Sequence, residues 1–376
     1  MEDQPAEKLK SLTQFLESDP KNPALLRDVA ETALEANECE LANSVFGRLN
    51  AVEPLKGEMA NLAGIAAMRS GDQNAAREWY AIAEQEMPED TGLQFNRAWS
   101  LALSGEFSAS AELLNEDMTK SLPQAAMLDM QIAHELGAFE DAEAKMDAYL
   151  ALHPEYPPLQ AAASVLAMDV DRPELAREAA LKGGEHPDAV TTLGTLDLGE
   201  FKVERAEAQF AKALATGHKN PRAEIGLGLV ALARKDYTTA AVAIDKGAEQ
   251  FGDHLGSWIA AGWSYLLAEE HEKARERFQK ALDTDDTFGE AQGSLAVMDV
   301  LEGNMEEGER KAQIALRLDR QSFSASLASI LIANAKDEPE AAQRILERAL
   351  HTSVMPGGET LEQAIVQSMA VGAVKN

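Results

Sequence analysis

Small residues recur every 34 positions along the second half of this sequence. They are Ala206, Ala240, Ala274, Gly308 and Ala342. Four residues after each comes a position that is mostly large and apolar, and three further on comes a second small position. The former hold Phe210, Ile244, Phe278, Ala312 and Leu346, and the latter hold Ala213, Gly247, Ala281, Ala315 and Ala349. A fixed period of this length indicates one supersecondary unit stacked on copies of itself.

The same period extends toward the N-terminus. Pro20, Pro54 and Pro88 are also 34 residues apart, at the turn that closes a unit, because proline cannot continue a helix. Units are predicted to start near residues 24, 58, 92, 124, 158, 188, 222, 256, 290 and 324. Seven of the nine spacings are 34 residues, and the other two are 32 and 30. We therefore predict ten units that cover nearly the whole chain.

Each unit has the pattern of two helices. The first helix carries apolar or small residues at i, i+3, i+4 and i+7, and the second carries a small, a large and a small residue at i, i+4 and i+7. Length and pattern resemble the tetratricopeptide repeat (TPR) family, whose unit is a helix–turn–helix. The resemblance implies an all-α, right-handed α-solenoid (superhelix). Asp197 and Asp299 stand where the family usually has an aromatic residue, so we expect looser packing there.

The spacings and the ends divide the chain into four predicted parts. Residues 1–23 form an N-terminal capping helix, and residues 24–187 form an N-terminal arm of five units, the last of them shortened. Residues 188–357 form a C-terminal arm of five regular units, and residues 358–376 form a C-terminal capping helix with Leu361, Ile365 and Met369 on one side. Terminal helices of this kind cover the core of the outermost repeats.

Charge and composition restrict the partners. The chain has 34 Lys and Arg against 64 Asp and Glu, a formal net charge of -30. Such a surface repels phosphate backbones and anionic lipid, so neither nucleic-acid binding nor direct membrane insertion is expected. The acidic start has no apolar stretch behind it and predicts no signal peptide, which favours a cytoplasmic location. The single cysteine, Cys39, excludes an intramolecular disulfide.

Motifs of enzymes and metal sites are missing from the pattern. No phosphate-binding loop occurs, and the seven histidines do not pair at ligand spacing. Asp283 to Asp286 resembles the start of a calcium loop, but Gly289 falls one place late. We therefore predict no catalytic residue, no cofactor and no metal, and a protein that is not an enzyme.

The first helices of the C-terminal arm carry extra apolar residues at the positions that face the inner surface of such arrays. The predicted partner-binding groove consists of Ile225, Leu229, Leu232, Ile259, Trp263, Leu266, Val297, Val300, Leu327 and Leu331. In the N-terminal arm the same face is mixed and predicts a second groove. Its residues are Asn61, Ile65, Phe95, Trp99, Gln131 and His134. Some TPR modules clamp a terminal carboxylate with Lys, Arg and Asn at the positions of the main groove. In the C-terminal arm these positions are apolar or small, so that activity is not expected here.

Three interpretations of the apolar face remain open. A partner's apolar or amphipathic segment binds in the groove, the C-terminal helix folds back into it, or the residues bury one another. For the whole chain we predict a protein-interaction scaffold or adaptor for one or more proteins or peptide segments. The alternatives are a peptide-sensing or chaperone-type regulator and a structural subunit that associates with itself.

Overall fold

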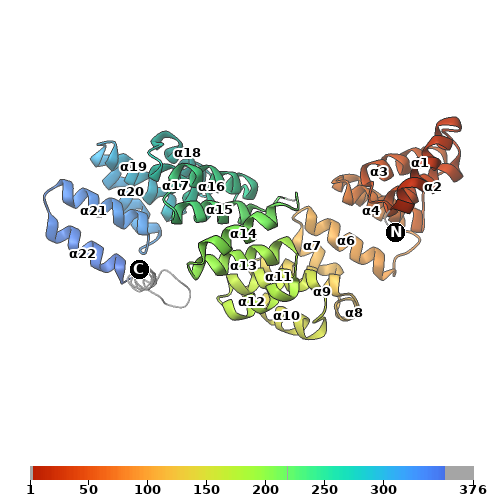
Figure 1. Cartoon of the computed structure of the whole chain (residues 1–376), viewed down its shortest axis with the longest axis horizontal. Helices are drawn as coiled ribbons and strands as arrows, with labels where there is room; N and C mark the ends of the chain where they lie inside the picture. The colour runs from red at the N-terminus through yellow and green to blue at the C-terminus, as the bar shows by residue number, and fades with distance from the viewer. Residues whose placement is uncertain (1–2, 218, 352–376) are drawn as a thin grey trace. The chain divides into compact units, whose positions relative to one another are not determined.

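The chain is a succession of helix pairs (Figure 1). The structure, a computed structural model, describes residues 3–217 and 219–351. Within these residues there are 22 helices and no strand. The predicted all-α fold of stacked helical repeats is confirmed. The helix predicted at 358–376, with Leu361, Ile365 and Met369, lies outside the described residues.

Two compact units make up the chain, Met1–Leu159 (unit 1) and Gln160–Asn376 (unit 2). The predicted arms meet instead between residues 187 and 188, and that division stays a prediction. Unit 1 begins with α1 (Asp3–Ser18), which packs on the first helix of the first repeat. Its Leu9 and Leu16 are buried there.

The first helices of the ten repeats all contain 13 residues. They are α2 (Pro23–Glu35), α4 (Gly57–Arg69), α6 (Thr91–Leu103), α9 (Pro123–Glu135), α11 (Pro157–Asp169), α13 (Pro187–Gly199), α15 (Pro221–Ala233), α17 (Leu255–Leu267), α19 (Gly289–Leu301) and α21 (Phe323–Ala335). Each begins one residue before the start that the sequence predicts. Asn22, Asp90, Asn220 and Ser322 cap four of them through the side chain.

The second helices vary in length, and the two repeats with irregular spacing differ from the others in their second helices. They are α3 (Cys39–Val52), α5 (Gln73–Glu84), α7 (Phe107–Leu113) with α8 (Glu116–Ser121), α10 (Phe139–Leu152), α12 (Pro173–Gly183), α14 (Val203–Leu214), α16 (Tyr237–Phe251), α18 (His271–Thr284), α20 (Met305–Leu318) and α22 (Pro339–Leu350). In the repeat with the 32-residue spacing the second helix breaks at Leu114 and Asn115, and Asn115 caps α8. In the repeat with the 30-residue spacing, α12 has only 11 residues.

Each turn between the two helices of a repeat contains one residue in the left-handed conformation. These residues are Asn37, Gly71, Gly105, Gly137, Asp171, Phe201, Lys235, Glu269, Gly303 and Asp337. The second helix starts two residues later in every repeat. The N–H that follows the left-handed residue bonds to the carbonyl of the eleventh residue of the first helix, as in Asp236 to Ala231 at 2.9 Å. This is the geometry of a Schellman C-cap, and it fixes the angle of the hairpin.

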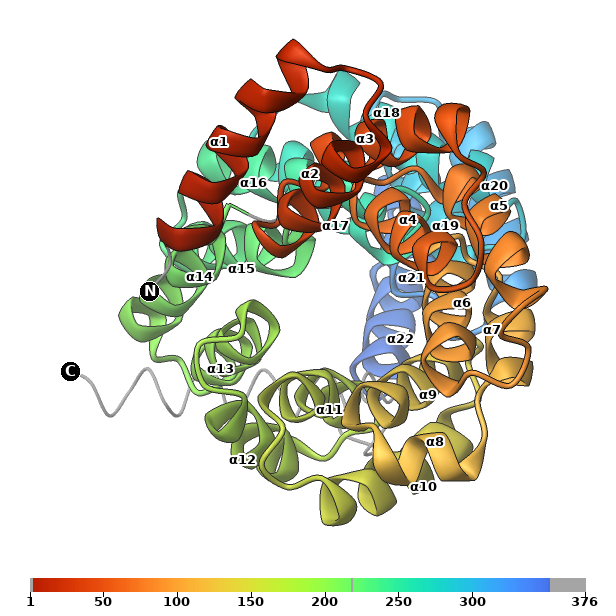
Figure 2. The same ribbon diagram turned by 90° about the vertical axis from the view of Figure 1, so that its right-hand side faces the viewer.

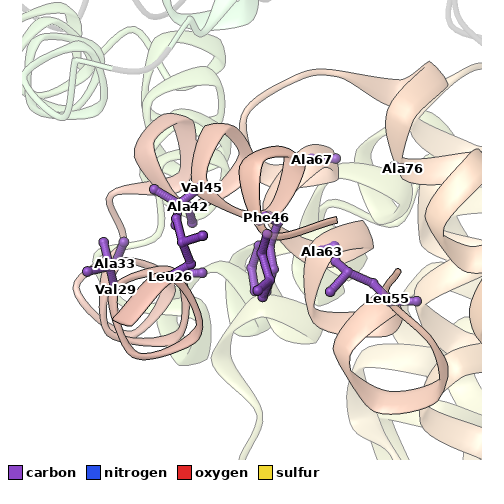
Figure 3. Packing of buried hydrophobic residues seen from close by; sticks show 14 of the residues in the cluster. Leu26, Val29, Ala33, Ala42, Val45, Phe46, Leu55, Ala63, Ala67 and Ala76 are labelled. Carbon is purple, nitrogen blue, oxygen red and sulfur yellow. The ribbon is translucent and has the colours of Figure 1, made fainter. Parts of the chain in front are cut away.

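The core runs between the helices, with large side chains seated against small ones. In unit 1, Figure 3 shows Phe46 on α3 between Leu26 on one side and Leu55 and Ala63 on the other. Phe46 is fully buried, as are Phe210 and Phe278 at the equivalent position in unit 2. Burial of aromatic side chains of this size is a leading source of core stability.

Two buried acids stand at the positions where looser packing is expected, and both lie close to basic side chains. The Asp299 carboxylate on α19 accepts hydrogen bonds from Arg275 of α18 at 2.8 Å and from Lys311 of α20 at 2.6 Å. It therefore links two neighbouring second helices. Asp197 on α13 is 1% exposed, with Arg177 of α12 at 3.6 Å and Arg205 of α14 at 3.4 Å. The aromatic residue of the family is thus replaced by ion clusters, because a buried carboxylate needs cationic partners.

Candidate functional site

The first helices of unit 2 form a pocket of about 460 Å³. Figure 2 shows α13, α15 and α17 following one another along one face of unit 2. The pocket crosses these helices and α11. Its apolar lining comes from Val165, Met168, Leu198, Phe210, Ile225 and Leu229. Its polar lining comes from Asp169, Asp188, Thr191, Thr192, Thr195, Arg222, His254 and Ser257. A pocket that is mostly apolar with a few polar groups is the usual form of a binding site.

The ring of Phe210, which is only 1% exposed, closes the floor of the pocket from below and occupies space that two glycines leave free. A Cβ on Gly226 would lie 2.4 Å from the ring atom Cε1 of Phe210, and a Cβ on Gly194 would lie 2.8 Å from it. The glycines belong to α15 and α13. Because neither has a side chain, the ring on α14 reaches between the two first helices and remains part of the lining. Alanine at either position would push it back.

The threonines of α13 are held in place by hydrogen bonds. The Thr191 hydroxyl donates to the Pro187 carbonyl at 2.8 Å and accepts from the Asn220 side-chain amide at 3.0 Å. Thr192 accepts from Ser164 of α11 at 3.0 Å. The polar side of the pocket is therefore rigid, since these side chains tie α13 to its neighbours on both sides.

Charged groups stand at the rim. Arg222, the second residue of α15, donates to Asp169, the last residue of α11, over 3.4 Å. At the start of α17, His254 Nδ1 accepts from the Ser257 N–H at 3.2 Å and lies 2.6 Å from the Ser257 hydroxyl oxygen. The His254 ring also lies against Phe251, with 5.1 Å between the centroids. His254 thus caps α17 and forms an aromatic wall of the pocket.

Of the ten residues predicted for the main groove, Ile225 and Leu229 line the pocket. Six others are half-buried and pack against core clusters. These are Leu232, Ile259, Trp263, Leu266, Leu327 and Leu331. Trp263 lies edge-on to Phe278, with 5.5 Å between the ring centroids. Val297 and Val300 are only 2% and 6% exposed, so the structure places them in the core and not on a surface open to a partner.

Val297 is buried in a cluster with Leu327, Ala328 and Leu331 of α21, whereas Val300 is buried against Gly308 of α20. The first helices α19 and α21 also pack directly on each other. Glu290 on α19 accepts the N–H groups of Phe323 and Ser324 at 2.6 and 3.2 Å. A Cβ on Gly293 would lie 2.6 Å from the Ala325 nitrogen, so only glycine permits this approach. The inner face therefore closes over these two first helices.

The residues predicted for the second groove do not line one common pocket. Phe95 and Trp99 pack on each other and against the cluster around Ala98 and Leu128 in unit 1. Asn61 accepts a hydrogen bond from Asn96 at 3.1 Å. Three further residues have separate environments: Gln131 is half-buried, the His134 ring contacts Phe139, and Ile65 lines a pocket between α2 and α4.

The sequence interpretation missed several residues of the pocket that the period locates, among them Thr191 and Thr195. Ile225, Leu229 and Leu232 correspond to Thr191, Thr195 and Leu198 one repeat earlier. Applying the 30-residue spacing leads on to Val165 and Met168. All of these except Leu232 line the pocket.

Comparisons with known proteins agree with the repeat. The family model described as tetratricopeptide repeat matches residues 27–91 and 191–255. The comparison with curated proteins finds no match. The two matched segments are tetratricopeptide repeats, and the same pair of helices recurs along the residues that the structure describes. Repeats of this family support a protein-interaction scaffold in general terms.

Solved structures share the fold at low sequence identity. A monomeric mutant of IFIT1 with Gppp-AAAA has a TM-score of 0.57 at 11% identity, over 93% of this chain and 94% of that one. A human IFIT1 dimer with m7Gppp-AAAA has a TM-score of 0.56 at 11% identity and the same coverage. The Cut9–Hcn1 heterotetramer of APC/C gives 0.48 at 13% identity, over 87% of this chain. This chain spans 58% of the length of that one.

Among the residues that the structure describes, no helix is long and apolar enough to cross a membrane. Within residues 3–217 and 219–351, no three His, Cys, Asp or Glu side chains gather as metal ligands would. The compartment of the protein stays a prediction.

Proposed function

We propose that this scaffold binds an apolar or amphipathic segment of a partner protein in the pocket formed by α11, α13, α15 and α17. The observation that carries the proposal is the open apolar lining over the Phe210 ring, with Leu229 39% exposed beside it. An exposed leucine in a concave, preformed site gains free energy when a partner's apolar side chain covers it.

Charge supports a protein segment over an anionic ligand. The rim contains two carboxylates, Asp169 and Asp188, and Arg222 already pairs with Asp169. Together with a formal net charge of -30, this arrangement disfavours phosphate groups such as those of nucleic acids. The pocket offers an apolar lining with the Asp169–Arg222 pair at its rim. This combination fits a peptide segment with one apolar side.

The test uses peptides selected from a displayed random library on the purified full chain. Leu229→Ser is compared with Val242→Ser, which changes an equally aliphatic side chain that is 57% exposed on α16, outside the pocket. We expect Leu229→Ser to weaken the affinity of the selected peptides about tenfold, or about 1.4 kcal/mol, and Val242→Ser to leave it unchanged. Equal effects of the two changes would overturn the proposal.

A further inference from the structure

A second pocket lies in unit 1 between α2 and α4, with a volume of about 510 Å³. Leu34 of α2 and Leu62 and Ile65 of α4 form its apolar surface. Glu31 and Glu35 of α2 and Glu58 of α4 surround this surface, together with Arg69. The pocket therefore combines apolar contact area with three carboxylates and one guanidinium.

Among the residues that the structure describes, no Lys, Arg or His forms an ion pair with Glu31, Glu35 or Glu58. Arg27, one turn before Glu31 on α2, instead lies 3.7 Å from Glu53. In the unit 2 pocket, by contrast, the rim carboxylate Asp169 is paired with Arg222. The unit 1 pocket thus holds three carboxylates without an ion pair among the described residues, and Arg69 is the one cation in its lining.

Two of these carboxylates occupy electrostatically unfavourable positions on α2. Glu31 and Glu35 are four residues apart on α2, where like charges repel. Glu35 is also the last residue of the helix, at the negative end of its dipole, and the last turn contains no basic residue. A cation bound between the two carboxylates would relieve both sources of repulsion.

We propose that this pocket binds a partner segment that presents a Lys or Arg side chain beside apolar side chains. The apolar side chains contact Leu34, Leu62 and Ile65, and the cation lies among the carboxylates of Glu31, Glu35 and Glu58. The residues of this site differ from those of the unit 2 pocket. This site selects for a basic segment, whereas in the unit 2 pocket the rim carboxylate of Asp169 already pairs with Arg222. The two sites can therefore be tested independently.

The experiment measures fluorescence anisotropy of labelled peptides on the full chain. The probe is an amphipathic peptide of about four helical turns made of Leu and Lys. One comparison peptide replaces Lys with Glu, and another replaces Leu with Ser. We expect the Leu–Lys peptide to bind at least about tenfold more tightly than either, and to weaken as salt is raised. A Lys–Ser peptide that binds as tightly as the Leu–Lys peptide would overturn the apolar part of the proposal.

A matched pair of variants separates the site from general attraction to an acidic protein. The triple change Glu31→Gln, Glu35→Gln and Glu58→Gln removes the three carboxylates of the pocket. The control changes the same number of exposed carboxylates on second helices of unit 1 and consists of Glu78→Gln, Glu112→Gln and Glu140→Gln. We expect the pocket variant to lose about tenfold in affinity for the Leu–Lys peptide and the control to lose no more than about twofold. Equal losses would refute a specific site.

Thermal unfolding distinguishes a ligand site from a structural role. Because the carboxylates of Glu31 and Glu35 repel each other, the pocket variant should unfold at the parent's temperature or above it. A lower unfolding temperature in the pocket variant would show that the carboxylates support the fold, and would overturn the proposal even if the affinity fell. The unit 2 pocket provides a separate readout, since its selected peptides should bind both variants as they bind the parent.

Discussion

The Asp169 carboxylate at the end of α11 lies 3.4 Å from the Arg222 guanidinium near the start of α15, and the pair spans the inner face of α13. Each side chain opposes the dipole of its own helix, because an acid stands at a C-terminus and a base at an N-terminus. Their pairing offsets both penalties and leaves one side of the pocket rim neutral. The pair thus connects first helices that are separated by a whole repeat.

A double-mutant cycle with Asp169→Asn and Arg222→Gln measures this connection. Both side chains are about two-fifths exposed, so we expect a coupling energy of about 0.2–1 kcal/mol. Urea denaturation gives the free energies of unfolding, and the coupling should fall when salt is raised. A coupling several times larger and insensitive to salt would contradict the view that the pair only shapes the rim.

Trp263→Ala tests whether the apolar face of α17 belongs to the core. The indole packs on Phe278 in a half-buried position, so we expect its loss to lower the free energy of unfolding by about 3 kcal/mol. The affinity for peptides bound at the unit 2 pocket should stay within about twofold of the parent's, since Trp263 does not line that pocket. Unchanged stability with lost binding would favour the sequence-based interpretation of Trp263 as a partner anchor.

Glu290→Ala should loosen the contact between α19 and α21. Its carboxylate accepts two backbone N–H groups at the start of α21, and charged hydrogen bonds of this kind contribute about 1.5–3 kcal/mol. Glu290→Gln keeps an acceptor and should cost less. Glu306→Ala, which removes an exposed acid from the first turn of α20, serves as the control. Equal thermal unfolding of Glu290→Ala and the control would show that the cap has no energetic role.

Lys235→Gly should stabilise the protein. Lys235 has φ of 62° in the turn between α15 and α16, a conformation that costs an L-residue about 1–2 kcal/mol and glycine almost nothing. Glycine's larger unfolded-state entropy reduces the gain, so we expect about 1 kcal/mol in urea denaturation. Lys235→Ala keeps the Cβ and should give no gain. The explanation fails if the two variants are equally stable.

The period predicted the first helices within one residue because the same packing contacts recur in every repeat. Gly71, Gly105 and Gly137 also predicted turns correctly, and the register places the other turns at Lys235 and Glu269, where no glycine occurs. The break at Leu114 and Asn115 could not be predicted, because residues 107–122 contain neither glycine nor proline. Only the cap that Asn115 provides, and the shortened spacing, indicate it in retrospect.

The position of the pocket depended on contacts between repeats that a sequence pattern does not contain. The repeat positions that line it were predicted, as Ile225 and Leu229 show, whereas the predicted groove is closed farther toward the C-terminus, where Val297 and Val300 are buried. The groove is closed there because α19 and α21 approach each other closely. Glu290 of α19 caps the start of α21, and Gly293 of α19 has no side chain to keep α21 away. The pairing of Asp169 with Arg222 spans 53 residues and likewise follows only from the fold.

Site-specific photo-crosslinking tests the central claim most directly. A benzophenone side chain is placed at position 229 in one protein and at position 242 in another, and each is irradiated with the same peptide selected on the full chain. If the pocket across α11, α13, α15 and α17 is the binding site, position 229 crosslinks to the apolar side of the peptide and unlabelled peptide suppresses the product. Position 242, on α16, then gives none. Crosslinking at position 242 with none at position 229 would contradict the account.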